Sequence, residues 1–342
     1  MTKNASQTRP STRTHVYIVD GTLSSLTEGR ETNAGRLYRL LSELGPSVAQ
    51  TLAYDPGVQG RGWRRYLCAA SGMGINESIL QGYRIIASRY RPGDRILLFG
   101  YSRGAYAVRS LAGLIDRIGL LAPEKATERR VLRAFRYYEL DEVTPGAREF
   151  RRRHCHVDVD IEMIGAWDTV KALGLPWPVL SWIAPPFATE FHDHGLGPHI
   201  KAGYHALALD EDRQSFDPIL WERVEGWRGR LEQVWFPGGH GDVGGELGGY
   251  EAARPLANLS LVWMLEKALS HGLTLPENWR SRLKLNPCAP MIGARRGLGR
   301  AFVLRAPRVA ASADGHQLHS SVRQREGLCP FPQAYTPRAA LA

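Results

Sequence analysis

The sequence predicts an α/β protein with a mostly parallel sheet that is flanked by helices on both faces. Short apolar runs recur along the chain and alternate with segments of helical periodicity, the pattern of parallel strands joined by crossover helices. One apolar run leads through a glycine-flanked turn straight into a helix. The chain has 342 residues, which is long enough for one large α/β core.

The stretch from residue 95 to residue 113 anchors this prediction. Residues 95–99 are typical of a strand buried on both faces, and residues 105–112 suit a packed helix. Between them, Gly-Tyr-Ser-Arg-Gly matches the G-x-S-x-G turn of α/β-hydrolases, so the expected architecture is α/β-hydrolase-like with Ser102 as candidate nucleophile. The motif alone is weak, and an ordinary serine in a strand-to-helix turn is the structural alternative.

The segments before this turn supply the first strands and helices. We expect strands at 15–19 and 50–54 and helices at 31–44 and 77–90. The glycine-rich stretch 57–74 lacks the G-K-[ST] of a phosphate-binding loop, so it is interpreted as a mobile loop beside the active site.

The segments after the turn are less regular. We expect a basic helix at 124–138, a linker around Pro145-Gly146, an alternating strand at 154–160 and a buried strand at 161–167. The strand at 154–160 would carry two histidines and two aspartates on one face. Adjacent side chains of one strand rarely converge on one ion, so a metal site there is disfavoured.

Two further features allow more than one interpretation. The Pro- and Trp-rich residues 176–186 suit an apolar lip for a lipid-like substrate as well as a packed loop. Four histidines within a short stretch suggest metal binding, but they lack metal-ligand spacing, so structural hydrogen bonding is favoured. They are His192, His194, His199 and His205.

Three expected strand ends carry reactive residues in the order serine, acid, histidine. Ser102, Asp168 and His240 each follow an apolar strand, and the glycine-rich loop with His240 leads to an expected amphipathic helix at 255–270. His240 would take the serine proton and Asp168 would orient the imidazole. Asp242 and Asp20 are competing candidates for the acid. The expected oxyanion donors are the Arg103 backbone N–H and one from the loop at Gly21 and Thr22.

Composition narrows the class of protein. Hydrophobic residues make up 43% and charged residues 23% of the chain, as in soluble globular proteins. The apolar runs are shorter than the roughly 20 residues of a membrane span, and residues 1–14 lack a signal-peptide core. We therefore expect a cytoplasmic protein with neither a signal peptide nor a transmembrane segment. Four scattered cysteines favour reduced thiols: Cys68, Cys155, Cys288 and Cys329.

The net charge of +10 raises the question of whether the protein binds nucleic acid or an anionic membrane surface. No stacking-aromatic module or recognition helix accompanies the charge, so we expect no nucleic-acid binding. Peripheral contact with an anionic membrane surface is consistent with it. We expect neither a cofactor nor a metal. The predicted organisation is a disordered leader at 1–14, a catalytic domain at 15–297 and a peripheral C-terminal segment at 298–342.

Several blocks of the sequence, beyond the three candidate residues, resemble one family. The blocks are Asp20-Gly21-Thr22, residues 99–105, Trp167-Asp168-Thr169-Val170, residues 205–211 and residues 235–245. In this order they resemble the uncharacterised α/β-hydrolase domain family that includes the type VI secretion phospholipase effectors of the first lipase-effector group. The likeness runs from about residue 15 to 275, with an echo at 319–323. It implies an α/β-hydrolase fold, hydrolysis of phospholipid acyl esters, delivery by a secretion system, and a delivery or immunity protein as partner.

The sequence therefore predicts a serine esterase or lipase that acts on acyl esters, with phospholipids as the leading substrate class. A non-catalytic binding or interaction protein on an α/β-hydrolase scaffold is the alternative from another class. A metal-dependent phosphoesterase is third. The sequence leaves open the acyl position, the oligomeric state and whether the protein is a secreted effector.

Overall fold

The computed structural model describes residues 12–22, 24–47, 49–57, 74–140, 143–170, 195–294, 302–310 and 316–328. Several expectations lie outside these ranges. They concern most of the leader, the glycine-rich loop, the segment 176–186, His192, His194 and residues 329–342.

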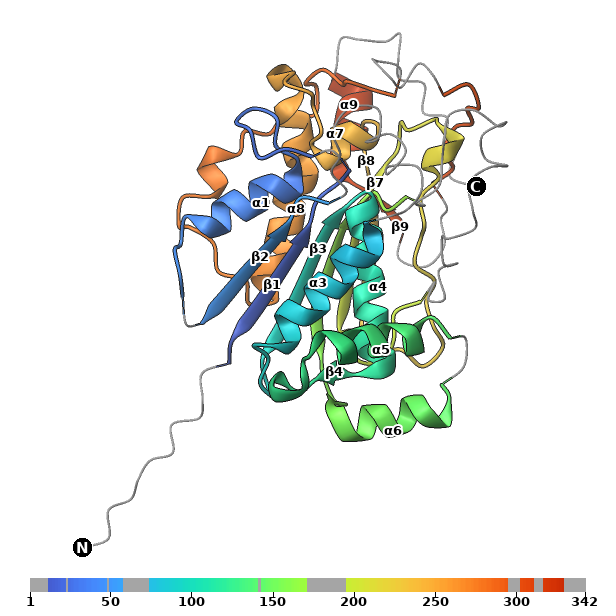
Figure 1. The fold of residues 1–342 in the computed structure, drawn as a ribbon. Coiled ribbons are helices and arrows are strands. Elements are labelled where there is room, and N and C mark those ends of the chain that lie inside the picture. The colour runs from blue at the N-terminus through green and yellow to red at the C-terminus, as the bar shows by residue number, and fades with distance from the viewer. Residues whose placement is uncertain are drawn as a thin grey trace, which may run out of the picture.

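A parallel sheet forms the centre of the molecule (Figure 1). Within the described residues it has seven strands in the order β2-β1-β3-β6-β7-β8-β9, and each strand runs parallel to its neighbours. The strands are β1 (Thr14–Val19), β2 (Gln50–Asp55), β3 (Arg95–Tyr101), β6 (Ile161–Trp167), β7 (Ala202–Ala208), β8 (Arg230–Phe236) and β9 (His316–Leu318). A separate antiparallel pair joins β4 (Leu120–Leu121) to β5 (Cys155–His156). The predicted α/β class is confirmed.

Helices cover both faces of this sheet (Figure 1). On one face lie α1 (Asn33–Ser42) and α8 (Arg254–Ser270), and on the other lie α3 (Ile75–Ala87), α4 (Arg103–Ile118) and α5 (Glu128–Tyr138). The shorter helices are α6 (Pro145–His154), α7 (His240–Gly244) and α9 (Ser320–Leu328), with 3₁₀ turns at Pro123–Lys125, Gln214–Phe216, Glu251–Ala253 and Arg280–Arg282. Strand side chains alternate between the two cores, as Val16 and Tyr17 of β1 illustrate.

Some local predictions were wrong, for identifiable reasons. The expected linker at Pro145 is the first turn of α6, because the Thr144 side chain accepts the Ala147 N–H and proline suits a first-turn position. This helix runs to His154, so the strand expected at 154–160 shrinks to the two residues of β5. The whole of β7 was missed, since glycine and histidine interrupt its apolar pattern although all its residues are buried.

Helix α8 was expected to be amphipathic, and this too was wrong. Most of its residues are buried, because it packs on β6 and β7 of the sheet and also contacts the helices α1 and α7. Its polar side chains are hydrogen-bonded inside the protein, as when Ser260 donates to the Val243 carbonyl and Asn258 to the Lys284 carbonyl. A helix covered on several sides has no polar face to display in its sequence.

Two observations concern the cysteines and the membrane. Cys288 is disulfide-bonded, so the expectation of reduced thiols is wrong at this residue, whereas Cys155 is free. No helix in the described part of the chain is both long and apolar enough to cross a membrane.

The C-terminal segment expected to be peripheral supplies β9, which pairs with β8. The domain boundary at residue 297 stays a prediction.

Candidate active site

Ser102 stands in the sharp turn between β3 and α4. Its backbone has φ 58° and ψ −120°, a conformation that is strained for any residue with a Cβ. The flanking glycines are required sterically. A Cβ at Gly100 would lie 2.4 Å from the Gly104 carbonyl oxygen, and a Cβ at Gly104 would lie 2.2 Å from the Val19 carbonyl oxygen. Both positions of the G-x-S-x-G pattern therefore need glycine, because neighbouring backbone atoms leave no room for a Cβ.

A continuous chain of hydrogen bonds joins the three candidate residues. His240 Nε2 lies 2.9 Å from Ser102 Oγ, and His240 Nδ1 lies 2.6 Å from Asp168 Oδ2. Asp168 is fully buried, and the other two side chains are nearly so. We call these residues the Ser–His–Asp chain. They meet because β3, β6 and β8 are parallel and end at the same edge of the sheet.

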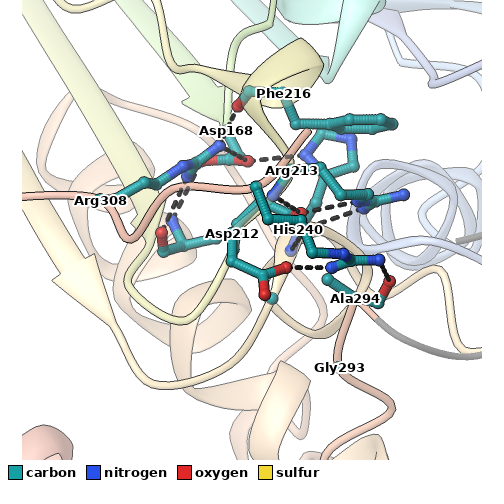
Figure 2. A network of polar contacts seen from close by, with 12 residues as sticks. Asp168, Asp212, Arg213, Phe216, His240, Gly293, Ala294 and Arg308 are labelled. Carbon is teal, nitrogen blue, oxygen red and sulfur yellow. Dashed lines mark hydrogen bonds and ion pairs between the residues drawn. The ribbon is translucent and has the colours of Figure 1, made fainter. Parts of the chain in front are cut away.

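The imidazole of His240 contacts two aromatic rings. The Tyr101 ring lies 4.9 Å from it, centroid to centroid, and the Phe216 ring lies 5.0 Å away in an edge-on arrangement. Figure 2 shows Phe216 beside His240. The Arg213 guanidinium packs 3.6 Å from the Phe216 ring centroid and forms an ion pair with Glu211. These contacts fix the plane of the imidazole and keep bulk water from its sides.

Three carboxylates hold the backbone of the loop that carries His240. Its successive N–H groups donate to a different carboxylate each: Gly238 to Asp210 at 2.6 Å, Gly239 to Asp242 at 2.9 Å and His240 to Glu211 at 3.0 Å. Asp242, one alternative acid, also accepts from two N–H groups of residues 292 and 293, and among the described contacts it has no hydrogen bond to the imidazole. Sequence reasoning missed Asp210 and Glu211, although the block at 205–211 contains them.

Asp20, the other alternative acid, belongs to the loop after β1. Its carboxylate accepts hydrogen bonds from the hydroxyls of Thr32 and Tyr54 and from the Gly21 N–H. Burial raises the pKa of Asp20 although these donors lower it. Among the described contacts none joins Asp20 to His240, so this carboxylate organises its own loop.

The loop after β1 lies against the start of α4, where Arg103 is the first residue. A Cβ at Gly104 would touch the carbonyl oxygens of both Val19 and Asp20. The Gly21 N–H is used by Asp20, at 2.7 Å. The Thr22 hydroxyl is buried and has no hydrogen-bond partner within the described residues. Both expected sources of oxyanion donors, Arg103 and the loop at Gly21 and Thr22, thus lie in neighbouring segments.

Arg308 was missed by the sequence reasoning. Its Nη1 donates to Asp168 Oδ1 at 2.7 Å and its Nη2 to Asp168 Oδ2 at 3.1 Å (Figure 2). Burial would raise the pKa of Asp168, but the Arg308 guanidinium and the hydrogen bond with His240 outweigh burial and hold this pKa well below its usual range. No local pattern around Arg308 could have revealed this contact.

A metal site is a separate question. In the ranges that the structure describes, no group of three or more His, Cys, Asp or Glu side chains could hold a metal ion. The two histidines of the 154–160 stretch flank the boundary between α6 and β5, and the described residues of this stretch form no such group.

Comparisons with known proteins supply the family. The family model described as "T6SS, Phospholipase effector Tle1-like, catalytic domain" matches residues 13–267. An uncharacterized protein of Saccharomyces cerevisiae is 31% identical over 244 residues, which cover 64% of this chain and 34% of the yeast protein. The chain thus spans about a third of the length of this relative.

Two solved structures show weaker likeness. The crystal structure of an uncharacterized protein from Pseudomonas aeruginosa has a TM-score of 0.44 at 17% identity, over 80% of this chain and 49% of that one. The crystal structure of ClbQ from the colibactin NRPS/PKS pathway has a TM-score of 0.34 at 11% identity, over 75% of this chain and 100% of that one. Neither score supports a functional conclusion.

The family match covers most of the chain, which therefore belongs to the family of Tle1-like phospholipase effector catalytic domains of the type VI secretion system.

Proposed function

We propose that this protein is a serine hydrolase that cleaves acyl esters, with phospholipids as its substrate class. The observation that carries the proposal is the Ser–His–Asp chain, with its two hydrogen bonds of 2.9 and 2.6 Å at the carboxyl edge of the sheet. The strained turn at Ser102 supports a nucleophile there, because strain of this kind clusters at functional sites. Family membership supports the phospholipid class.

The proposed reaction has two halves. His240 Nε2 takes the Ser102 proton while Oγ attacks the acyl carbon, and the imidazolium then gives this proton to the departing alcohol as the ester C–O bond breaks. Water hydrolyses the acyl-serine by the same steps, with His240 again as base. Asp168 accepts the Nδ1–H, which selects the tautomer with a free Nε2 lone pair and stabilises the imidazolium.

The tetrahedral intermediate needs donors for its oxyanion. We assign one to the Arg103 backbone N–H, at the first position of α4, where the helix dipole also favours negative charge. Within the expected pair at Gly21 and Thr22, the Gly21 N–H already donates to Asp20. Thr22, whose buried hydroxyl has no partner among the described residues, is therefore our candidate for the second donor.

A fluorophosphonate probe tests the proposal directly, since it reacts with activated serines. We expect the purified protein to be labelled, and labelling to disappear in Ser102→Ala and in His240→Ala. Ser110→Ala is the matched control, because Ser110 is a buried serine of α4, the helix that follows Ser102, and among the described contacts it has no hydrogen bond to the Ser–His–Asp chain. Hydrolysis of phospholipid vesicles by the wild type and not by Ser102→Ala would then establish the substrate class.

Two outcomes would contradict the proposal. Labelling that persists in Ser102→Ala would move the nucleophile elsewhere. An unlabelled wild type would favour a non-catalytic binding protein on the same scaffold.

A further inference from the structure

Residues 302–310, which we call the C-terminal strap, lie along the loop that follows β7. The Ala306 N–H donates to the Asp212 carbonyl at 2.8 Å, and the Gln214 N–H donates to the Leu304 carbonyl at 3.1 Å. Arg305 adds an ion pair with Asp212. Backbone pairing and this ion pair therefore fix the register of the strap against the loop.

This register delivers Arg308 to the buried acid. The guanidinium makes two hydrogen bonds to the Asp168 carboxylate and two more to the carbonyl oxygens of Ala208 and Phe216. Arg308 is 6% exposed. A planar fork with four acceptors, in a site that excludes water, has one favourable orientation.

Asp168 depends on such a partner because it is 0% exposed. An ionised carboxylate without a cation is very costly in such surroundings, and it would bind a proton instead. Each oxygen accepts two bonds: Oδ1 from the Ala208 N–H and Arg308, and Oδ2 from His240 and Arg308. Removing Arg308 would take one donor from each oxygen.

The other titratable groups around Asp168 offer no substitute. They are His240, His205 of β7 and Tyr101 of β3. Burial lowers the pKa of His205 to about 3, so this ring is neutral at physiological pH. Burial also raises the pKa of Tyr101 well above its usual value, so its hydroxyl is neutral as well. Among the described groups, Arg308 is thus the permanent cation in contact with the acid.

We propose that Arg308 is a positioning residue that keeps Asp168 ionised and aimed at His240, so that the active site is completed by the C-terminal strap. The strap lies beyond residue 267, where the family match ends. The proposal rests on the proposed function, because Asp168 needs its charge and orientation only if His240 works as a base. It assigns a role in the reaction to a segment outside the matched domain.

The first test is the pH dependence of fluorophosphonate labelling in the full chain. We expect Arg308→Gln to slow labelling at pH 7 on the order of a hundredfold, the cost of a misplaced reacting group. The acid limb of the rate profile should move to higher pH, because Asp168 without its cation takes up a proton more readily. Arg308→Lys should recover part of the rate, since it restores charge without the fork.

Arg305→Gln is the matched control, because it removes a strap ion pair without touching Asp168. We expect its pH profile to overlay that of the wild type. A uniform loss of rate in Arg308→Gln with no movement of the acid limb would overturn the proposal. An equal shift of the acid limb in Arg305→Gln would also overturn the proposal, because a general disturbance of the C-terminal strap would then explain the shift in both variants.

A double-mutant cycle of Arg308 and Asp168, measured by thermal unfolding, separates this proposal from the proposed function. Arg308→Gln should lower Tm by on the order of 5–10 °C, because it leaves a buried charge unpaired. In an Asp168→Asn background the same change should cost less than half as much. Additive effects would overturn the proposed pairing. A wild type that is not labelled would count against the serine hydrolase, while strong coupling in the cycle would still support the pairing of Arg308 with Asp168.

Discussion

Two opposite edges of the central sheet each carry a histidine bonded between a hydroxyl and a carboxylate. At the carboxyl edge this is the Ser–His–Asp chain. At the amino edge, His15 Nδ1 lies 2.8 Å from Thr51 Oγ1, and His15 Nε2 lies 3.0 Å from Asp94 Oδ2. All members of the second group come from the beginnings of strands or the loop before β3. The two groups join the same kinds of side chain at similar distances, but the ring nitrogens are exchanged: the hydroxyl lies next to Nε2 of His240 and next to Nδ1 of His15.

A second difference between the two groups lies in the backbone that presents the hydroxyl. Thr51 and His15 are direct partners in the register of β2 and β1, so ordinary strand geometry explains their contact. Ser102 instead occupies a strained turn at the start of a helix, beside the loop at Gly21 and Thr22. A hydroxyl–histidine–carboxylate group therefore does not by itself mark an active site. The strained turn, and the oxyanion donors that we propose beside it, are the features that distinguish the carboxyl edge.

The largest expected difference is in the rate of ester hydrolysis after replacement of each of the two carboxylates, Asp168 and Asp94. We expect Asp168→Asn to reduce the rate of ester hydrolysis about 10⁴-fold, because an amide favours the wrong tautomer of His240. Asp94→Asn should leave this rate within about threefold, since its effect falls on stability. Steady-state kinetics on a short acyl ester would measure both. Similar losses of rate in the two variants would remove the distinction between the edges.

The second largest expected difference is in the stability cost of replacing a glycine at each edge by alanine. A Cβ at Gly104 would lie 2.2 Å from one backbone oxygen and 2.4 Å from another, so Gly104→Ala should cost about 3 kcal/mol or more and abolish labelling. Gly93, with φ +94° and no heavy atom near its ideal Cβ, precedes Asp94 at the amino edge. Gly93→Ala should cost about 1–2 kcal/mol from backbone strain and leave labelling intact. Urea denaturation measures both costs, and equal values would show that the turn at Ser102 can relax.

The smallest expected effect is a difference in pH dependence. Burial raises the pKa of Asp210, beside the His240 loop, to about 6. Burial also acts on Asp94, but the hydrogen bond with His15 and two backbone N–H groups outweigh it and lower the pKa of Asp94. Asp210 therefore reduces stability as pH rises from its unfolded pKa near 4 to about 6, whereas Asp94 adds stability that is lost as pH falls through its lowered folded pKa.

Asp210→Asn keeps an acceptor for the Gly238 N–H and removes the buried charge. We expect it to raise Tm at pH 8 by several degrees, corresponding to about 2 kcal/mol at most, and to have little effect at pH 4. Asp94→Asn should show the opposite trend, with its largest loss of Tm at pH 8. Thermal melts from pH 4 to pH 8 provide the measurement. A Tm of Asp210→Asn that falls below the wild type as pH rises would contradict the raised pKa.

Much of the fold could be predicted because it follows from local rules. The strands β1, β2, β3 and β6 were predicted within a few residues from short apolar runs, β8 was predicted as the apolar strand before His240, and the turn at Ser102 was predicted from its two glycines. Strand β7 and helix α6 were not, because Gly203 and His205 are tolerated in a strand that neighbours cover, and Pro145 suits a first helical turn as well as a linker. In these places tertiary packing or capping outweighed the local pattern.

The sequence alone determined the α/β class, the turn that presents Ser102, and the strand ends that bring Asp168 and His240 to the same edge. Local sterics and hydrophobic periodicity impose these features, so they leave a readable pattern. Only the tertiary structure decided which carboxylate contacts His240, and that Arg308 contacts this carboxylate. Such contacts join segments far apart in the chain, and a buried ion pair places no constraint on the residues next to either partner. Their existence therefore follows from where the strands and the C-terminal strap lie in space.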